Sequence, residues 1–148
     1  MSLNFRRTFR SAVLTKLLEW GAAALEKSLN QPSLPHAIVL LNDTEVGIDA
    51  KDWETEHATQ GLLSCVSGAL DYVEGVPRFR ELAHYWRNLG KQIDTVEDLI
   101  LRYYSSFKVV RMPRKPHYML MDLQIGRLHC EIREIAMHHS RRRERPEC

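Results

Sequence analysis

The feature that most constrains the fold is a short apolar run near residue 40. Ala37 to Leu41 carry no charge, and the run ends abruptly in the polar residues 42–45, Asn-Asp-Thr-Glu. Such a run is typical of a β-strand buried on both faces, as in parallel sheets that helices cover. Ligands of those sheets bind beyond the carboxyl ends of the strands. We therefore expect any binding site to lie at residues 42–45.

Helical patterns occupy the sequence on both sides of this strand. Apolar residues spaced by three and four positions predict one helix from Phe5 to Leu29 and a second with its inner face between Trp53 and Val73. A third helix is predicted to begin at Pro77, because proline suits the first helical turn. Gly90 closes this helix.

The carboxyl-terminal third predicts one strand, one further short run and two helices. A short helix capped by Asp94 or Thr95 is expected to reach Tyr103. A strand follows over Phe107 to Met112, and another short run covers Tyr118 to Met121. The last helix is predicted to turn one apolar face inward, formed by Leu123, Ile125, Leu128, Ile132, Ile135 and Ala136.

This order of elements indicates an α/β fold, rich in helix, with helices packed on a small, mostly parallel sheet. We predict a partial three-layer sandwich over residues 1–139, followed by a basic polar tail over residues 140–148. Two strands are too few for a stable sheet of this kind, because three or more are normally required. We therefore expect polypeptide ahead of Met1 to complete it.

Composition narrows the class of protein. A chain of 148 residues with 44% hydrophobic residues is one domain or part of one. The formal charge of +2 gives no general electrostatic case for nucleic acid. Cys65, Cys130 and Cys148 are scattered, which argues against a disulfide framework and favours a reducing compartment.

The chain is expected to be cytoplasmic, without a membrane span. No apolar stretch approaches the roughly 18 to 20 residues that a spanning helix needs. The alternative location is mitochondrial, because the start of the chain has a presequence-like composition, with no acid before Glu19. Its basic residues there are Arg6, Arg7, Arg10 and Lys16.

The sequence resembles one group of proteins over about Thr8 to His129. These are multidomain proteins of filamentous fungi with a patatin-like phospholipase domain, also described as lysophospholipase-like. The matching residues include Leu17-Glu19-Trp20, Ser33-Leu34-Pro35-His36-Ala37-Ile38, Leu41-Asn42-Asp43-Thr44, Trp53, Ala58-Thr59-Gln60, Tyr85-Trp86, Gly90-Lys91, Tyr103-Tyr104-Ser105-Ser106 and Val109-Val110-Arg111. The resemblance implies a region ahead of the lipase domain that is similar to the second half of a P-loop GTPase-like module. GTP and magnesium would then belong to the complete module, and this chain alone is expected to hold no cofactor.

The candidate nucleotide-binding residues are Asn42, Asp43 and Glu45. They occupy the place of an N-K-x-D turn, which reads guanine through a carboxylate. The match is imperfect, because Asp43 replaces the lysine and Glu45 would stand in for the aspartate. The alternative is that Asn42 and Asp43 cap the strand end by bonding to their own backbone.

No catalytic residue is predicted in this chain. A patatin-type enzyme needs a serine in a G-x-S-x-G turn, and none of the serines has that glycine frame. Gly90 and Lys91 form the one Gly-Lys pair, but Gln92 follows and no phosphate-binding motif results. The chain alone should therefore hydrolyse neither lipid nor nucleotide.

Other polar and aromatic residues can be interpreted as structural or as functional. His129, Cys130, His138 and His139 are poorly spaced for a metal, so no metal site is predicted. Arg141, Arg142 and Arg143 form either a solvated tail or a weak nucleic-acid contact. The aromatic residues Trp53, Phe79, Trp86 and Tyr103 are expected in the core, although Tyr85, Trp86, Tyr103 and Tyr104 could also form a stacking platform.

Three functions follow from the sequence. The first is a noncatalytic structural and regulatory segment of a fungal patatin-like lipase protein, which contributes the base-recognition side of a GTP-binding-like module. Its expected partners are the missing amino-terminal half or other domains of a larger protein. An oligomer is a further alternative. The alternatives are a lipid acyl hydrolase whose catalytic domain lies outside this chain, and a nucleic-acid binder that uses its basic termini.

Overall fold

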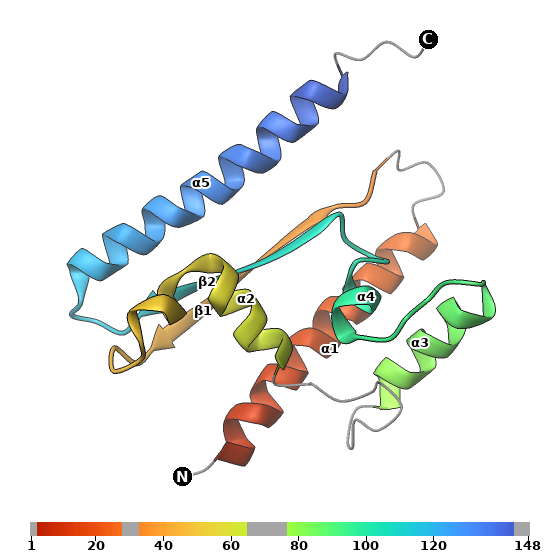
Figure 1. Cartoon of the computed structure of the whole chain (residues 1–148), viewed down its shortest axis with the longest axis horizontal. Coiled ribbons are helices and arrows are strands. Elements are labelled where there is room, and N and C mark those ends of the chain that lie inside the picture. The colour runs from red at the N-terminus through yellow and green to blue at the C-terminus, as the bar shows by residue number, and fades with distance from the viewer. Residues whose placement is uncertain (1–2, 28–32, 65–76, 144–148) are drawn as a thin grey trace. The chain divides into compact units, whose positions relative to one another are not determined.

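A computed structural model describes residues 3–27, 33–64 and 77–143 of the chain. Its elements, in chain order, are α1 (Leu3–Lys27), β1 (His36–Thr44), the 3-10 helix η1 (Ala50–Trp53), α2 (Thr55–Leu63), α3 (Pro77–Asn88), α4 (Val96–Ile100), β2 (Ser106–Pro113) and α5 (Tyr118–Arg143) (Figure 1). The predicted helix-rich α/β class is confirmed, with helices accompanying a small parallel sheet.

β1 and β2 form a two-stranded parallel sheet. The Ser105 backbone N–H donates to the Pro35 carbonyl at 2.8 Å, and the Arg114 N–H donates to the Thr44 carbonyl at 3.1 Å. Residues therefore advance together along both strands, as parallel pairing requires. In addition, the Ser106 hydroxyl lies 2.7 Å from His36 Nδ1, which fixes the start of the pair.

The burial of β1 corrects the prediction that this strand is covered on both faces. Ala37 is buried, but Ile38, Val39 and Leu41 are only half-buried, and 43% of Leu40 is exposed. The strand also continues to Thr44, so Asn42 and Asp43 belong to it instead of to a turn after it. A continuous apolar run predicts a strand but does not show whether its faces are buried, because other segments must pack on those faces.

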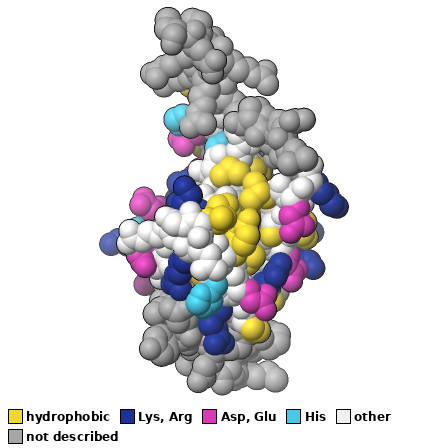
Figure 2. All heavy atoms as spheres, turned by 90° about the vertical axis from the view of Figure 1, so that its right-hand side faces the viewer, with side chains coloured by type: hydrophobic (Ala, Val, Ile, Leu, Met, Phe, Trp, Pro, Cys, Tyr) yellow, Lys and Arg dark blue, Asp and Glu magenta, His cyan; other side chains and the backbone are white. Residues whose placement is uncertain are grey.

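Contacts divide the chain into two compact units. Unit 1 combines Met1–Ala37 with Thr59–Phe107, and unit 2 combines Ile38–Ala58 with Lys108–Cys148. Large hydrophobic side chains reach the surface in both units, among them Tyr85 and Leu89 in unit 1 and Leu40 in unit 2. Figure 2 shows such side chains gathered in a group, with acidic and basic side chains beside it.

The core of unit 1 brings α1 close to the segment after α4. Gly21 of α1 is buried, and a Cβ atom added there would lie 2.6 Å from Tyr103 Cβ. The Tyr104 hydroxyl donates to the Leu17 carbonyl at 2.7 Å. Other buried side chains of this unit are Leu14, Leu18, Leu62, Leu63, Phe79, Leu82, Ala83, Ile93, Val96, Leu99, Ile100 and Phe107.

The helix boundaries in unit 1 follow local sequence signals. α3 begins at Pro77 as predicted, and Gly90 takes a φ of 77° in the turn after it. Thr95 caps α4 through a capping box, in which Asp98 N–H donates to Thr95 Oγ1 and Thr95 N–H donates to Asp98 Oδ2. α4 ends at Ile100, and turns carry the chain on to Tyr103, where the helix was expected to end.

The predicted second helix begins as two pieces. η1 ends at Trp53, and Glu54 has the extended φ and ψ of −72° and 139° before α2 starts at Thr55. The rest of that predicted helix, from Cys65 to Val73, lies outside the described residues.

α5 corrects one prediction from the sequence. The short run Tyr118 to Met121, for which the sequence indicates no type of element, forms its first turn. The face expected to turn inward is largely outside: Leu123, Ile125 and Ile132 are 54%, 39% and 50% exposed. The inner face is centred on the fully buried Gln124, so neighbouring positions in the sequence rotate away from the unit. α5 continues to Arg143, which makes residues 140–143 helical.

No helix within the described ranges is both long and apolar enough to cross a membrane.

Candidate functional site

The predicted nucleotide-binding residues stand at the carboxyl end of β1 in unit 2. Asn42, Asp43 and Glu45 are all exposed. Asp43 has a φ of 59°, in the left-handed region that Asp tolerates better than most residues. Its carboxylate accepts two hydrogen bonds from Arg114, from Nε at 2.8 Å and from Nη2 at 2.9 Å. The structure therefore pairs Asp43 with a residue that follows β2.

This ion pair sets the electrostatics of the strand end. The hydrogen bonds from Arg114 and its positive charge hold the pKa of Asp43 below the ordinary 3.8. The same bonds raise the pKa of Arg114, and the charge of Glu45 raises it further. Asp43 and Glu45 thus both stabilise the charged form of Arg114. A guanine base would have to compete with that guanidinium for the Asp43 carboxylate.

Two arginines hold the end of η1 in the same unit. Arg111 of β2 donates from Nε to the Asp52 carbonyl at 3.0 Å, and Arg127 of α5 donates from Nη1 to the Trp53 carbonyl. Carbonyl groups at a helix end lack partners within the helix, and arginine side chains can supply them. Arg111 and Trp53 are buried. The arginines thereby fix the backbone that leads into α2.

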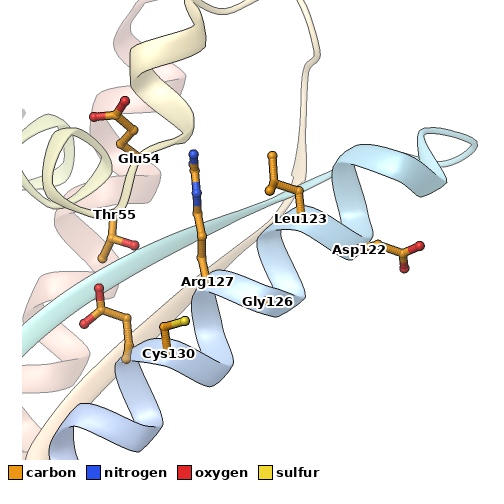
Figure 3. A pocket seen from close by; sticks show the side chains of 8 residues that line it. Glu54, Thr55, Asp122, Leu123, Gly126, Arg127 and Cys130 are labelled. Carbon is orange, nitrogen blue, oxygen red and sulfur yellow. The ribbon is translucent and has the colours of Figure 1, made fainter.

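A groove of about 580 Å³ opens beside Arg127 (Figure 3). Figure 3 shows Arg127 extending from α5 toward the segment of Glu54 and Thr55, whereas Asp122 points away from it. A Cβ atom at Gly126 would meet nothing within 4 Å, so the missing side chain leaves the groove open there. The lining residues are Glu54, Thr55, Asp122, Leu123, Gly126, Arg127, Cys130 and Glu131.

The groove carries more acidic than basic side chains. Leaving aside Asp122, whose carboxylate points away, the acidic Glu54 and Glu131 outnumber the one arginine, which itself bonds to a backbone carbonyl. This balance suits a basic or neutral ligand better than a phosphate. Cys130 is an exposed free thiol at the edge. Within residues 3–27, 33–64 and 77–143, no three His, Cys, Asp or Glu side chains gather as metal ligands.

The remaining candidate residues lie on α5. Arg141, Arg142 and Arg143 belong to the last turn of α5, and their side chains lie outside the described part. His129 and His138 are exposed on the same helix.

The aromatic residues are mainly structural. Tyr103 and Tyr104 are buried, and Trp86 meets Tyr85 and Tyr103 edge-on with ring centroids 5.4 and 5.7 Å apart. Tyr85 alone of these four is largely exposed, at 53%. The prediction of a core position is confirmed for Trp53, Phe79 and Tyr103, and Trp86 is half-buried. These positions do not form an open platform for bases.

Sequence reasoning missed Arg111, Arg127 and Gln124. Arg111 interrupts the apolar run of β2, and a charge inside such a run signals a buried polar contact. Gln124 is fully buried, and in the described part of the chain neither amide atom has a hydrogen-bond partner. No sequence signal marked the groove, because its two sides are far apart along the chain.

Comparison of the chain with protein-family models, curated proteins and solved structures gives no match. The resemblance to fungal patatin-like proteins therefore stays a prediction from the sequence.

Proposed function

We propose that this chain is a noncatalytic structural and regulatory segment that works by packing against further polypeptide. The observation that carries the proposal is the incomplete cover of β1, whose central Leu40 is 43% exposed. Parallel strands rich in Val, Ile and Leu are normally covered on both faces. An uncovered apolar strand therefore favours a partner that supplies the missing layer.

The size of the sheet supports the same proposal. In the described part of the chain the sheet has two strands, so each strand pairs along one edge only. An open edge accepts a further strand through main-chain hydrogen bonds. We propose that the added strand comes from the amino-terminal half of the module that the sequence resembles. The lipase domain of such a protein would lie elsewhere in the longer chain.

The regulatory part of the proposal concerns the end of β1. Asn42 and Glu45 are exposed there, and Asp43 is paired with Arg114. If the completed module binds GTP, this end is where base recognition would fall, and the Asp43 pair would be the element that ligand binding changes. Magnesium and the phosphates would be held by the added half, because this chain has no phosphate-binding motif.

Association with the upstream half tests the proposal. Leu40→Glu should weaken binding to that half, because it places a charge on the uncovered face of β1. Leu101→Glu is the matched control, since Leu101 is 40% exposed but lies in unit 1 outside the sheet. Circular dichroism checks that both variants fold. Association that Leu40→Glu leaves unchanged would refute this docking role.

Two activity measurements complete the test. Labelled GTP should bind only to the assembled protein, and replacing Asn42 and Glu45 should weaken it if they recognise the base. An assembled protein that binds no GTP would keep the structural role and end the nucleotide role. Serine-dependent ester hydrolysis by the chain alone would contradict the noncatalytic assignment.

A further inference from the structure

A continuous row of apolar residues runs along α5. Its members follow one another at alternating intervals of three and four positions, which is the heptad spacing of helices that pair side by side. The row consists of Tyr118, Met121, Ile125, Leu128, Ile132 and Ile135. None of these positions carries a polar side chain apart from the tyrosine hydroxyl.

Unit 2 leaves this row partly uncovered. Tyr118, Ile125 and Ile132 are 61%, 39% and 50% exposed, while Met121, Leu128 and Ile135 are half-buried. The side of α5 that the unit does cover is centred on Gln124, which is fully buried. One flank of the row is therefore closed by the chain itself, and the other flank, with Asp122 and His129, is open.

We propose that α5 pairs in antiparallel orientation with α5 of a second copy of this chain. Ile125 lies beside the two-fold axis and meets Ile125 of the second copy, while Tyr118 meets Ile132. The interface is self-complementary, as a two-fold dimer requires. The open flanks then face each other, because the flank that holds Gln124 is buried within its own unit.

The polar side chains on the open flank favour this orientation. Antiparallel pairing about Ile125 brings Asp122 opposite His129 of the second copy, and it does so twice through the symmetry. A ring N–H of His129 can donate to the Asp122 carboxylate, and polar residues that complement each other across paired helices set the partner and the direction. Antiparallel helices also set the positive end of one dipole beside the negative end of the other. The pairing thus satisfies both the apolar row and the polar residues beside it.

A second exposed row on α5 lacks this continuity. Met119, Leu123 and Met137 are 89%, 54% and 51% exposed, but Gly126 and Arg133 stand between them at the same spacing. Part of this row lines the groove of Figure 3. It therefore offers exposed apolar side chains without a heptad seam, which makes it the source of a matched control.

Sedimentation equilibrium of the full chain tests the pairing. The wild-type chain should form a reversible dimer, and Ile132→Glu should weaken it roughly tenfold or more, as loss of a buried apolar anchor does. Met137→Glu should leave the dimer unchanged, although Met137 is exposed to the same degree as Ile132. A monomer throughout the concentration range, or equal dimerisation of Ile132→Glu, would overturn the proposal.

Charge exchange tests the orientation. Asp122→Lys and His129→Asp should each weaken the dimer, and the double variant should recover it by placing Lys opposite Asp. Failure of the double variant to recover would overturn the antiparallel register. Leu40→Glu should leave this dimer intact, so the result is separate from the docking of β1.

Discussion

Arg114 holds both carboxylate oxygens of Asp43, with Nε at 2.8 Å from Oδ1 and Nη2 at 2.9 Å from Oδ2. The pair links the end of β1 to the residue that follows β2. Both side chains are more than half exposed, so the bond acts on the geometry of the strand end more than on global stability. The Asp43 carboxylate at the end of β1 therefore already has a partner within the chain.

Arg114→Ala should raise the pKa of Asp43 toward 3.8, because it removes the hydrogen bonds that stabilise the carboxylate. In the wild type the folded pKa is depressed, so the pair's stabilisation is present above the unfolded pKa and lost as pH falls through the folded one. Carboxyl chemical shifts followed by NMR titration measure the change. Lys115→Ala is the control, and an unchanged Asp43 titration in Arg114→Ala would contradict the assignment.

Thr95→Ala should destabilise unit 1 by about 1 kcal/mol, because α4 loses the side-chain acceptor of its capping box. Thr95→Ser keeps the hydroxyl and should cost much less. Thermal unfolding of the three proteins compares them. Equal losses in the two variants would show that the hydroxyl does not cap the helix.

Asp98 should titrate below 3.8. Its partial burial alone would raise the pKa, but hydrogen bonds from Thr95 and from the backbone N–H of Thr95 and Asp94 outweigh that effect. The depressed pKa means that the box stabilises unit 1 above the unfolded pKa and fails as pH falls through the folded pKa. NMR titration should therefore show a higher Asp98 pKa in Thr95→Ala than in the wild type.

Two glycine substitutions should change the free energy of unfolding in opposite directions. Gly21→Ala would place a Cβ atom 2.6 Å from Tyr103 Cβ and should destabilise the chain by about 1–3 kcal/mol. Gly126→Ala meets nothing within 4 Å and should stabilise α5 by up to about 1 kcal/mol through helix propensity. Urea unfolding measures both. Gly21→Ala unfolding like the wild type would contradict the close approach of α1 to Tyr103.

Arg127→Ala should loosen the end of η1, because the Trp53 carbonyl loses its donor. The Glu54 N–H bonds to the Lys51 carbonyl at 2.9 Å and reports on this turn. A net loss of about 1 kcal/mol corresponds to roughly fivefold faster amide exchange at Glu54. Arg133→Ala, on an exposed position of the same helix, should leave that amide unchanged. Equal exchange in the two variants would refute the role of Arg127.

Local signals made much of the fold predictable. The apolar run from Ala37 to Leu41, the proline at 77 and the Thr95 cap each depend on neighbouring residues, and each marks a real element. The face of α5 that packs inward was not predictable in this way. The helix carries apolar residues on more than one side, and the unit covers the side with Gln124. Which side packs depends on tertiary contacts and not on periodicity.

The candidate site was predictable only at the end of β1. Asn42, Asp43 and Glu45 could be placed there from the sequence, but the partner Arg114 could not, because it is distant along the chain. The groove beside Arg127 depends on α5 meeting Glu54 and Thr55 in unit 2. Distances of this kind are set by the packing of remote segments, which a single sequence does not encode as a pattern.

We propose that a further segment completes β1, and amide hydrogen exchange across Ile38 to Leu41 tests this proposal. Exchange should be measured on the chain alone and on the chain assembled with the amino-terminal half of the module. We expect the exchange of these amides to become markedly slower in the assembly, while the exchange of the α3 amides does not change. Equal exchange of Ile38 to Leu41 in the two samples, with assembly verified by sedimentation, would contradict it.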